Sequence, residues 1–199
     1  MSVSGCLFDF AKLNDVSKNV ISRMTAEDVY KQASEWAKEY DPEIYTAMTK
    51  DPEYTKAIFS IGRGGKNPRK DIALWSDVRG YIDLFFDEFF AIKDEYADKF
   101  SKADIKLSLE EFVKSFNIED DSNTWFEKIK DIADMLGYAS DMKAYKLNPE
   151  SYKGNVSDLS MFIRIAVTGK LNSPDMYSVM QILGYDTVVS RINKMINSL

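Results

Sequence analysis

The stretch from Asp41 to Gly62, DPEIYTAMTKDPEYTKAIFSIG, decides the local fold and shows a pattern that recurs along the 199-residue chain. It contains the triplet Asp-Pro-Glu twice, beginning at Asp41 and at Asp51. In each triplet the aspartate can accept a hydrogen bond from an unpaired helix N–H, the proline suits the first helical turn, and the glutamate favours the positive end of the helix dipole. Gly62 follows an apolar run, as a left-handed C-terminal cap does. The stretch therefore predicts two consecutive helix starts and a helix end.

The same start and stop signals occur throughout the sequence. Further helix starts are predicted at Thr25, Ser76, Ser108, Ser122, Asn148, Ser173 and Asp186. Further helix ends are predicted at Gly137, Gly169 and Gly184. Between these signals the apolar residues recur three and four positions apart, whereas alternation with a period of two is scarce. We therefore predict an all-α fold of two packed helical subdomains.

The junction between the subdomains is predicted near Ser101 to Lys106. A long acidic and aromatic helix is predicted to cover Tyr81 to Asp98, and a new helix is predicted to begin at the Ser108 cap. The expected organisation is a leading segment, 1–24, followed by a first helical subdomain, 25–101, and a second one, 102–199.

The composition excludes several classes of chemistry. The chain has no histidine, so it cannot contain a Ser-His-Asp triad, a His-Glu-x-x-His zinc site or an imidazole base. The lone Cys6 excludes an intramolecular disulfide and suits a reducing compartment. The apolar runs are far shorter than the ~20 residues that a membrane helix needs. We expect a cytoplasmic protein with no membrane partner, and a monomer by default.

Two basic islands stand out in a chain whose 26 basic and 32 acidic residues give a formal charge of −6. The first, residues 63–70 (RGGKNPRK), has four positive charges and no acid. The second runs from Met142 to Lys170, with five positive charges against two negative ones. A polyanion would bind at the islands and be repelled by the acidic segment between them. From the residues alone, an ordinary solvated surface is the favoured interpretation of each island, and contact with an anion is the alternative that stays open.

The segment from Thr168 to Met176 is the densest candidate site. A helix end at Gly169, a short loop and a new helix start would expose backbone N–H groups beside small polar and apolar side chains. Such a corner can accept a phosphate or hold an unstacked base. Arg164 lies in an apolar helical stripe just before it, so its guanidinium either pairs with an acid in the core or points at a ligand.

In these residues the chain resembles the C-terminal, anticodon-binding part of bacterial glutamyl-tRNA synthetases. The motifs that carry the resemblance, in order, are Asp141-Met142-Lys143-Ala144-Tyr145-Lys146, Tyr152-Lys153-Gly154, Asp158-Leu159-Ser160, Arg164-Ile165-Ala166-Val167-Thr168-Gly169, Ser173-Pro174-Asp175-Met176 and Val179-Met180-Gln181-Ile182-Leu183-Gly184. Residues Gly5 to Asn14 resemble the segment that follows the catalytic half in that family.

The resemblance implies a role without catalysis for this chain. The intact enzyme would join glutamate to its tRNA with ATP and Mg²⁺, while this piece would bind the anticodon arm of glutamate tRNA. The two ATP-binding motifs of the family's catalytic half are absent from the sequence. We therefore expect an excised C-terminal piece that needs no cofactor and does not activate glutamate by itself.

The resemblance also suggests the residues that contact RNA. The matching positions in the last helical part are Arg164, Leu171, Ser173, Pro174 and Met176. In the first subdomain, Arg69 is the nearest match to a family arginine that helps to distinguish the third anticodon base. Lysines of the two islands complete the predicted RNA contacts: Lys70, Lys143 and Lys146. A glutamine that some members use three residues before the arginine is Met161 here.

A second hypothesis remains from the residues alone. The acidic balance and the dense aromatic residues are compatible with a helical scaffold that binds other proteins and no RNA. A partner whose binding survives the loss of both basic islands, together with no tRNA binding, would favour it.

Overall fold

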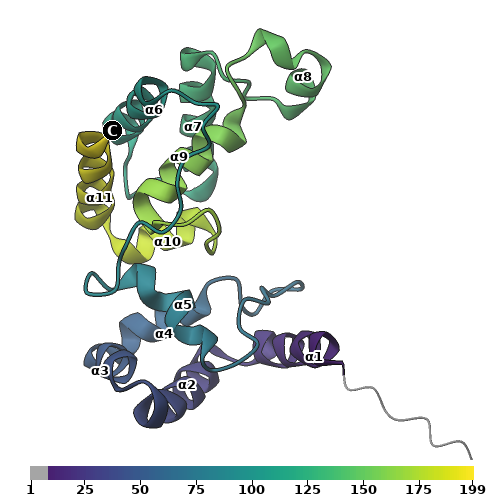
Figure 1. Ribbon diagram of the computed structural model, residues 1–199, viewed down its shortest axis with the longest axis vertical. Helices are drawn as coiled ribbons and strands as arrows, with labels where there is room; N and C mark the ends of the chain where they lie inside the picture. Colours follow the sequence, from purple (N-terminus) through teal and green to yellow (C-terminus); the bar gives the residue numbers. More distant parts are fainter. Residues whose placement is uncertain (1–8) are drawn as a thin grey trace, which may run out of the picture. The chain divides into compact units, whose positions relative to one another are not determined.

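The computed structural model describes residues 9–199, and the chain divides into two compact units, Met1–Phe86 and Asp87–Leu199 (Figure 1). Cys6 and the beginning of the predicted segment 1–24 lie outside the described residues. From residue 9 to residue 199 the chain forms helices joined by turns and irregular segments, with an isolated bridge between Ala139 and Asn155 as the only β-type pairing. The all-α prediction is confirmed. None of the described helices combines the length and the apolar character that crossing a membrane requires.

The first unit is built from short helices. They are α1 (Phe10–Arg23), α2 (Ala26–Tyr40), α3 (Pro42–Lys50), α4 (Pro52–Ser60), α5 (Asp77–Ile82) and the 3₁₀ turn η1 (Asp83–Phe85). Helix α2 packs against α3 and α4, and its inner face consists of Val29, Ala33 and Ala37, all fully buried. These small residues let the two later helices approach closely, so that Met48 and Phe59 fill the core between them.

Asp41 joins three elements of this unit at one side chain. It ends α2, and its carboxylate caps α3 by accepting a hydrogen bond from the Ile44 N–H at 3.3 Å. The guanidinium of Arg79 in α5 also binds this carboxylate through Nε and Nη2, at 2.6 and 2.5 Å. The hydrogen bonds from Arg79 hold the pKa of the Asp41 carboxyl below its usual value of 3.8.

The substitution Asp41→Asn is expected to lower the free energy of unfolding by about 1 kcal/mol at pH 7, because asparagine keeps the cap but loses the charged partner of a half-exposed arginine. The lowered pKa means that the contribution of Asp41 is present above pH 3.8 and is lost as the pH falls through the folded-state pKa. Urea unfolding at pH 7 and at pH 3 should therefore show a smaller loss on acidification for the variant than for the wild type.

Glu43 offers a matched control for this prediction. It also accepts a hydrogen bond from Arg79, at 3.0 Å, but its side chain is 76% exposed. Glu43→Gln should therefore change stability little. Equal effects of the two substitutions would contradict the role assigned to Asp41.

The second unit surrounds a central helix, α9 (Val156–Thr168). The other elements are α6 (Lys102–Ser115), α7 (Ser122–Leu136), α8 (Met142–Leu147), the 3₁₀ turn η2 (Pro149–Ser151), α10 (Met176–Leu183) and α11 (Tyr185–Ser198). Helix α9 packs against α6, α7 and α11, and most of its residues are buried (Figure 1). This burial on several sides explains its nearly continuous apolar sequence.

The course of residues 86–101 differs from the predicted helix over Tyr81 to Asp98. Helix α5 ends at Ile82, and after η1 the chain runs as an irregular segment to residue 101. This segment packs on α9, because the Tyr96 hydroxyl donates to the Phe162 carbonyl at 3.2 Å and Phe100 meets the Phe162 ring edge to face at 4.8 Å. Like charges four residues apart, such as Asp94 and Asp98, also disfavour a helix here. Tertiary packing outweighs the local periodicity.

The same packing places the division of the chain after Phe86, earlier than the junction predicted near Ser101. Residues 87–101, assigned from the sequence to the first subdomain, belong to the second unit. The cap predicted at Ser108 is also wrong. Ser101 caps α6 by accepting from the Asp104 N–H, and Ser108 lies fully buried inside that helix.

Candidate nucleic-acid interface

The corner between α9 and α10 begins with a tightly held helix end. Thr168 is the last residue of α9, and its hydroxyl donates to the Arg164 carbonyl at 2.8 Å. Gly169 follows with φ +72°, the left-handed conformation that the sequence predicts for this cap. Residues 170–175 follow as a short loop in which Leu171, Asn172 and Asp175 are exposed.

The irregular segment described above supports this loop from outside. The carbonyl of Gly169 accepts hydrogen bonds from the backbone N–H groups of Lys93 and Asp94, at 2.8 and 3.1 Å. The Asp94 carboxylate in turn accepts from the Leu171 N–H at 2.6 Å. We call these three bonds the Asp94 clasp. They fix the conformation of the loop from a segment 77 residues away in the sequence.

The structure brings two of the predicted residues, Arg164 and Leu171, together. The Arg164 guanidinium is half-buried on α9, and its Nη1 donates to the Leu171 carbonyl at 3.3 Å. The Leu171 side chain is 40% exposed beside it. The pair offers hydrogen-bond donors next to an apolar face, which suits a base recognised by its edge and packed on its face.

The remaining predicted residues of the corner divide into accessible and buried ones. Ser173 is half-exposed, but Pro174 is buried and Met176 is only 5% exposed. Pro174 and Met176 therefore pack beneath the loop, and their side chains shape its surface from below.

The start of α10 also lies later than predicted, because Asp175 is the cap and accepts from the Ser178 N–H at 2.9 Å. Its carboxylate occupies this helix N-terminus, which disfavours a phosphate there.

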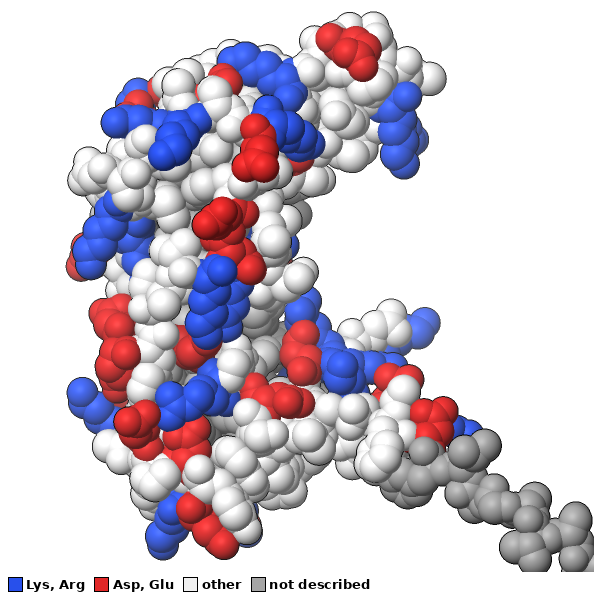
Figure 2. All heavy atoms as spheres, in the orientation of Figure 1, with Lys and Arg blue, Asp and Glu red and all other residues white. Residues whose placement is uncertain are grey.

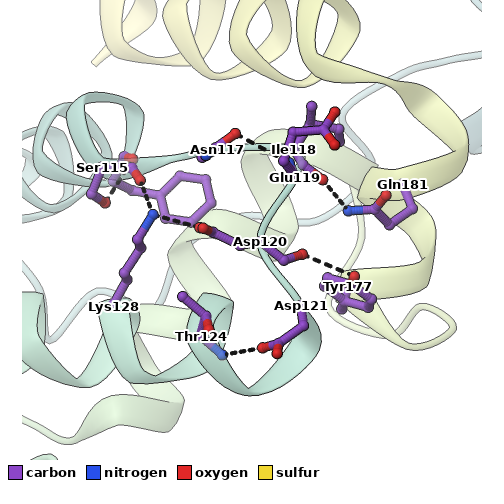
Figure 3. Close-up of polar contacts among 11 residues, drawn as sticks. Ser115, Asn117, Ile118, Glu119, Asp120, Asp121, Thr124, Lys128, Tyr177 and Gln181 are labelled. Atoms are coloured by element: carbon purple, nitrogen blue, oxygen red, sulfur yellow. Dashed lines mark hydrogen bonds and ion pairs between the residues drawn. The ribbon is translucent and has the colours of Figure 1, made fainter.

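Helix α10 is anchored on its other side by the loop between α6 and α7 (Figure 3). The Tyr177 hydroxyl donates to the Asp120 carbonyl at 3.0 Å, and the Gln181 amide donates to the Ile118 carbonyl at 2.8 Å. Lys128 stabilises this loop by donating to the Ser115 carbonyl and to the Asp120 carboxylate, at 3.1 and 2.5 Å. The corner is thus held between two segments that are distant in sequence.

The predicted lysines of the second island lie apart from the corner. Lys143 and Lys146 are exposed on α8, which Figure 1 shows at the end of this unit opposite to α10. Lys153 pairs with Asp104 at 2.7 Å, so part of the predicted positive charge is neutralised. On the face drawn in Figure 2, basic side chains are interspersed with acidic ones.

The predicted contacts of the first island belong to the first unit. Arg69 is held in a bidentate pair with Asp71, with both N–O distances at 2.8 Å, whereas Lys70 is exposed. Arg63 donates to the Ile21 carbonyl at 2.6 Å, and burial lowers the pKa of its guanidinium. Two of the four cations in this island therefore hold the loop itself in place.

Sequence reasoning missed two residues that build the corner, Asp94 and Arg191. Asp94 has no local signal, because its partner lies 77 residues away. Arg191 has a local sequence signal, because this charged residue lies in the apolar stripe of α11 between Val188 and Ile192. It is only 4% exposed, and it donates to the carbonyl of Val167 at 3.0 Å.

Similarity to known proteins agrees with the resemblance. The chain is 43% identical over 196 residues to a glutamate–tRNA ligase of Acetivibrio thermocellus, covering 98% of this chain and 36% of that protein. It is 46% identical over 196 residues to a glutamate–tRNA ligase of Clostridium perfringens strain 13, covering 96% and 36%. The chain thus spans about a third of the length of these relatives.

Solved structures share the fold. A glutamate tRNA ligase from Elizabethkingia meningosepticum, crystallised with its amino acid, superposes with a TM-score of 0.59 at 17% identity, over 96% of this chain and 33% of that one. A glutamate–tRNA synthetase from Elizabethkingia anophelis gives 0.58 at 16% identity. The family model described as "Anticodon binding domain" matches residues 30–196, which include every described residue of the corner. Because this match extends over most of the chain, the chain belongs to the family of anticodon-binding domains.

Proposed function

We propose that this chain binds the anticodon arm of glutamate tRNA as one module of a glutamate–tRNA ligase. The observation that carries the proposal is the corner formed by Arg164 and Leu171 within a chain of this family. An arginine is a donor only, so it matches the acceptor atoms on a base edge, and an exposed leucine can pack on the base face. The Asp94 clasp holds Leu171, and the bond from Arg164 to the Leu171 carbonyl joins the arginine to it, so the corner is ordered before RNA arrives and less entropy is lost on binding.

The activity of the whole protein is part of the same proposal. The intact ligase would attach glutamate to tRNA with ATP and Mg²⁺, and the relatives at 43 and 46% identity are named for that reaction. The ATP-binding chemistry would lie in the part of those proteins that this chain does not match. As a component of translation, the module would act in the cytoplasm and as a monomer.

The test is a filter-binding titration of the chain with glutamate tRNA and with the same tRNA altered at the third anticodon base. Binding is expected to be tighter for the unaltered tRNA and to weaken steeply as salt rises. Equal affinity for both tRNAs would contradict recognition of the anticodon. An affinity that does not change with salt concentration would contradict the proposed electrostatic contribution to binding.

The substitution Arg164→Ala is expected to weaken binding of the unaltered tRNA by about tenfold, because it removes charge-assisted hydrogen bonds. Arg164→Lys should recover only part of the affinity, since lysine keeps the charge but loses the planar fork. Lys194→Ala, which removes an exposed positive charge from α11 of the same unit, is the matched control. A loss as large for the control as for Arg164→Ala would contradict a specific role of Arg164.

A further inference from the structure

The first unit contains an open pocket of about 660 Å³ between the end of α1 and the basic loop, residues 63–70. We call it the α1 pocket. From α1 it is lined by Asn19, Ser22 and Arg23, which share one helix face because they are three and four positions apart. From the basic loop it is lined by Gly64, Gly65, Lys66, Asn67, Pro68 and Lys70. The lining has three cationic side chains and no acidic one.

The basic loop keeps its shape without using these three cations. Its ends are joined by a hydrogen bond from the Arg69 N–H to the Gly62 carbonyl at 3.0 Å, and the Arg63 guanidinium binds the last turn of α1. Arg69 packs its aliphatic stem against Gly62, where a Cβ atom would come within 2.7 Å of it, and its charge is matched by Asp71. Arg63 and Arg69, which do not line the pocket, therefore hold the loop that does.

The three cations that line the pocket indicate an anionic ligand. Arg23, Lys66 and Lys70 are exposed, and none of them makes an ion pair with an acidic residue in the part of the chain from 9 to 199. Three like charges around one pocket raise the free energy of the unliganded protein, and an anion between them relieves that repulsion. The side-chain amides of the lining residues Asn19 and Asn67 add groups that can hydrogen-bond to phosphate oxygens.

The shape of the pocket favours a polymer over a free ion. Its volume is far larger than a phosphate ion needs. Gly64 and Gly65 border open space, since a Cβ atom on either would meet nothing within 4 Å. A strand can therefore pass over the backbone of the loop with one phosphate between the three cations.

We propose that the α1 pocket binds a backbone phosphate of the RNA that this module recognises. The inference rests on the proposed function. It assigns to the first unit a contact with the RNA backbone that does not depend on the identity of the base. It also changes the role of the first island: Arg69, which the resemblance relates to base discrimination, holds the loop, while Lys66, Lys70 and Arg23 contact the backbone.

The experiment compares two double variants of the full chain in tRNA binding over a range of salt concentrations. Lys66→Ala with Lys70→Ala removes two pocket cations, and Lys31→Ala with Lys38→Ala removes two exposed charges of α2 in the same unit. The pocket variant should bind tRNA about tenfold more weakly. Its plot of log affinity against log salt should be shallower by roughly 0.7 to 0.9 for the one phosphate lost, whereas the α2 variant should keep the wild-type slope. The loss should be the same for the tRNA altered at the third anticodon base.

Any other outcome would contradict the inference, and the pattern of binding shows whether the proposed function fails with it. If the wild type binds tRNA and the two double variants behave alike, the pocket proposal fails while the proposed function stands. If the wild type does not bind tRNA, both fail. A titration with inorganic phosphate, followed by the amide resonances of Gly64 and Gly65, separates a free ion from RNA. Saturation at low phosphate concentration, with no loss of RNA affinity in the pocket variant, would assign the pocket to the free ion instead.

Discussion

The substitution Gly169→Ala is expected to destabilise the second unit by about 3 kcal/mol or more. Gly169 has φ +72°, a conformation that costs an L-residue about 1 kcal/mol or more. In addition, a Cβ atom here would lie 2.1 Å from the carbonyl oxygen of Ala91. Because this neighbour is backbone, residues 91–94 would have to move away, and the Asp94 clasp would break.

Gly137 provides the control that separates strain from overlap. It caps α7 with φ +83°, but a Cβ atom there would meet nothing within 4 Å. Gly137→Ala should therefore cost only the strain of the left-handed conformation, about 1 kcal/mol. Urea unfolding of both variants measures the difference, and tRNA binding by any folded Gly169→Ala protein should be weaker than that of Gly137→Ala. Equal free energies of unfolding would contradict the close approach of Ala91.

The second large effect is expected at Arg191. Its guanidinium donates to the Val167 carbonyl and, through Nη2, to the Asp87 carboxylate at 2.8 Å, and it lies 3.7 Å from the centre of the Phe90 ring. It thus connects the end of α9, α11 and the beginning of the irregular segment that carries the Asp94 clasp. Arg191→Met should destabilise the unit by about 2 to 4 kcal/mol, because the apolar stem is kept while a buried carbonyl loses its donor.

Arg191→Lys and Lys194→Ala test this role. Lysine keeps the charge but cannot reach both acceptors with a planar fork, so its free energy of unfolding should lie between those of the wild type and Arg191→Met. Lys194 is exposed on the same helix, and its loss should change stability by less than about 0.5 kcal/mol. A stability of Arg191→Met equal to that of the wild type would show that these contacts contribute nothing net.

Helix boundaries were predictable where the controlling bond is local. The caps at Thr25, Asp41 and Asp51 each accept from an N–H three residues later, so both partners are visible within one turn of sequence. Gly137 and Gly169 end their helices for a reason that is equally local, the sign of φ. The predicted start at Ser173 missed the true cap, Asp175, by two residues. The predicted start at Ser108 was wrong by two helical turns, because Ser101 caps α6 through an equally local bond to the Asp104 N–H.

The candidate site was predictable only in part. The order of the motifs identifies Arg164 and Leu171 as candidates, but their contact depends on the turn at Gly169 and on the course of the loop after it. The burial of Pro174 and Met176 was not visible, because a short loop and the start of a short helix do not indicate which residues pack on them. The pairing of Arg69 with Asp71 was within reach of the sequence, since two residues separate them.

By itself, the sequence determined that the chain is helical, where several helices begin and end, which chemistry it excludes, and which family it resembles. Only the tertiary structure decided the irregular course of residues 86–101, the burial of Arg191 and the separation of the basic loop's cations into two that hold the loop and two that line the pocket. The physical reason is the range of the interactions. Caps and helical stripes act over three or four residues, whereas the bonds to Leu171 and Asp87 join residues 77 and 104 positions apart, and their formation depends on how whole helices pack.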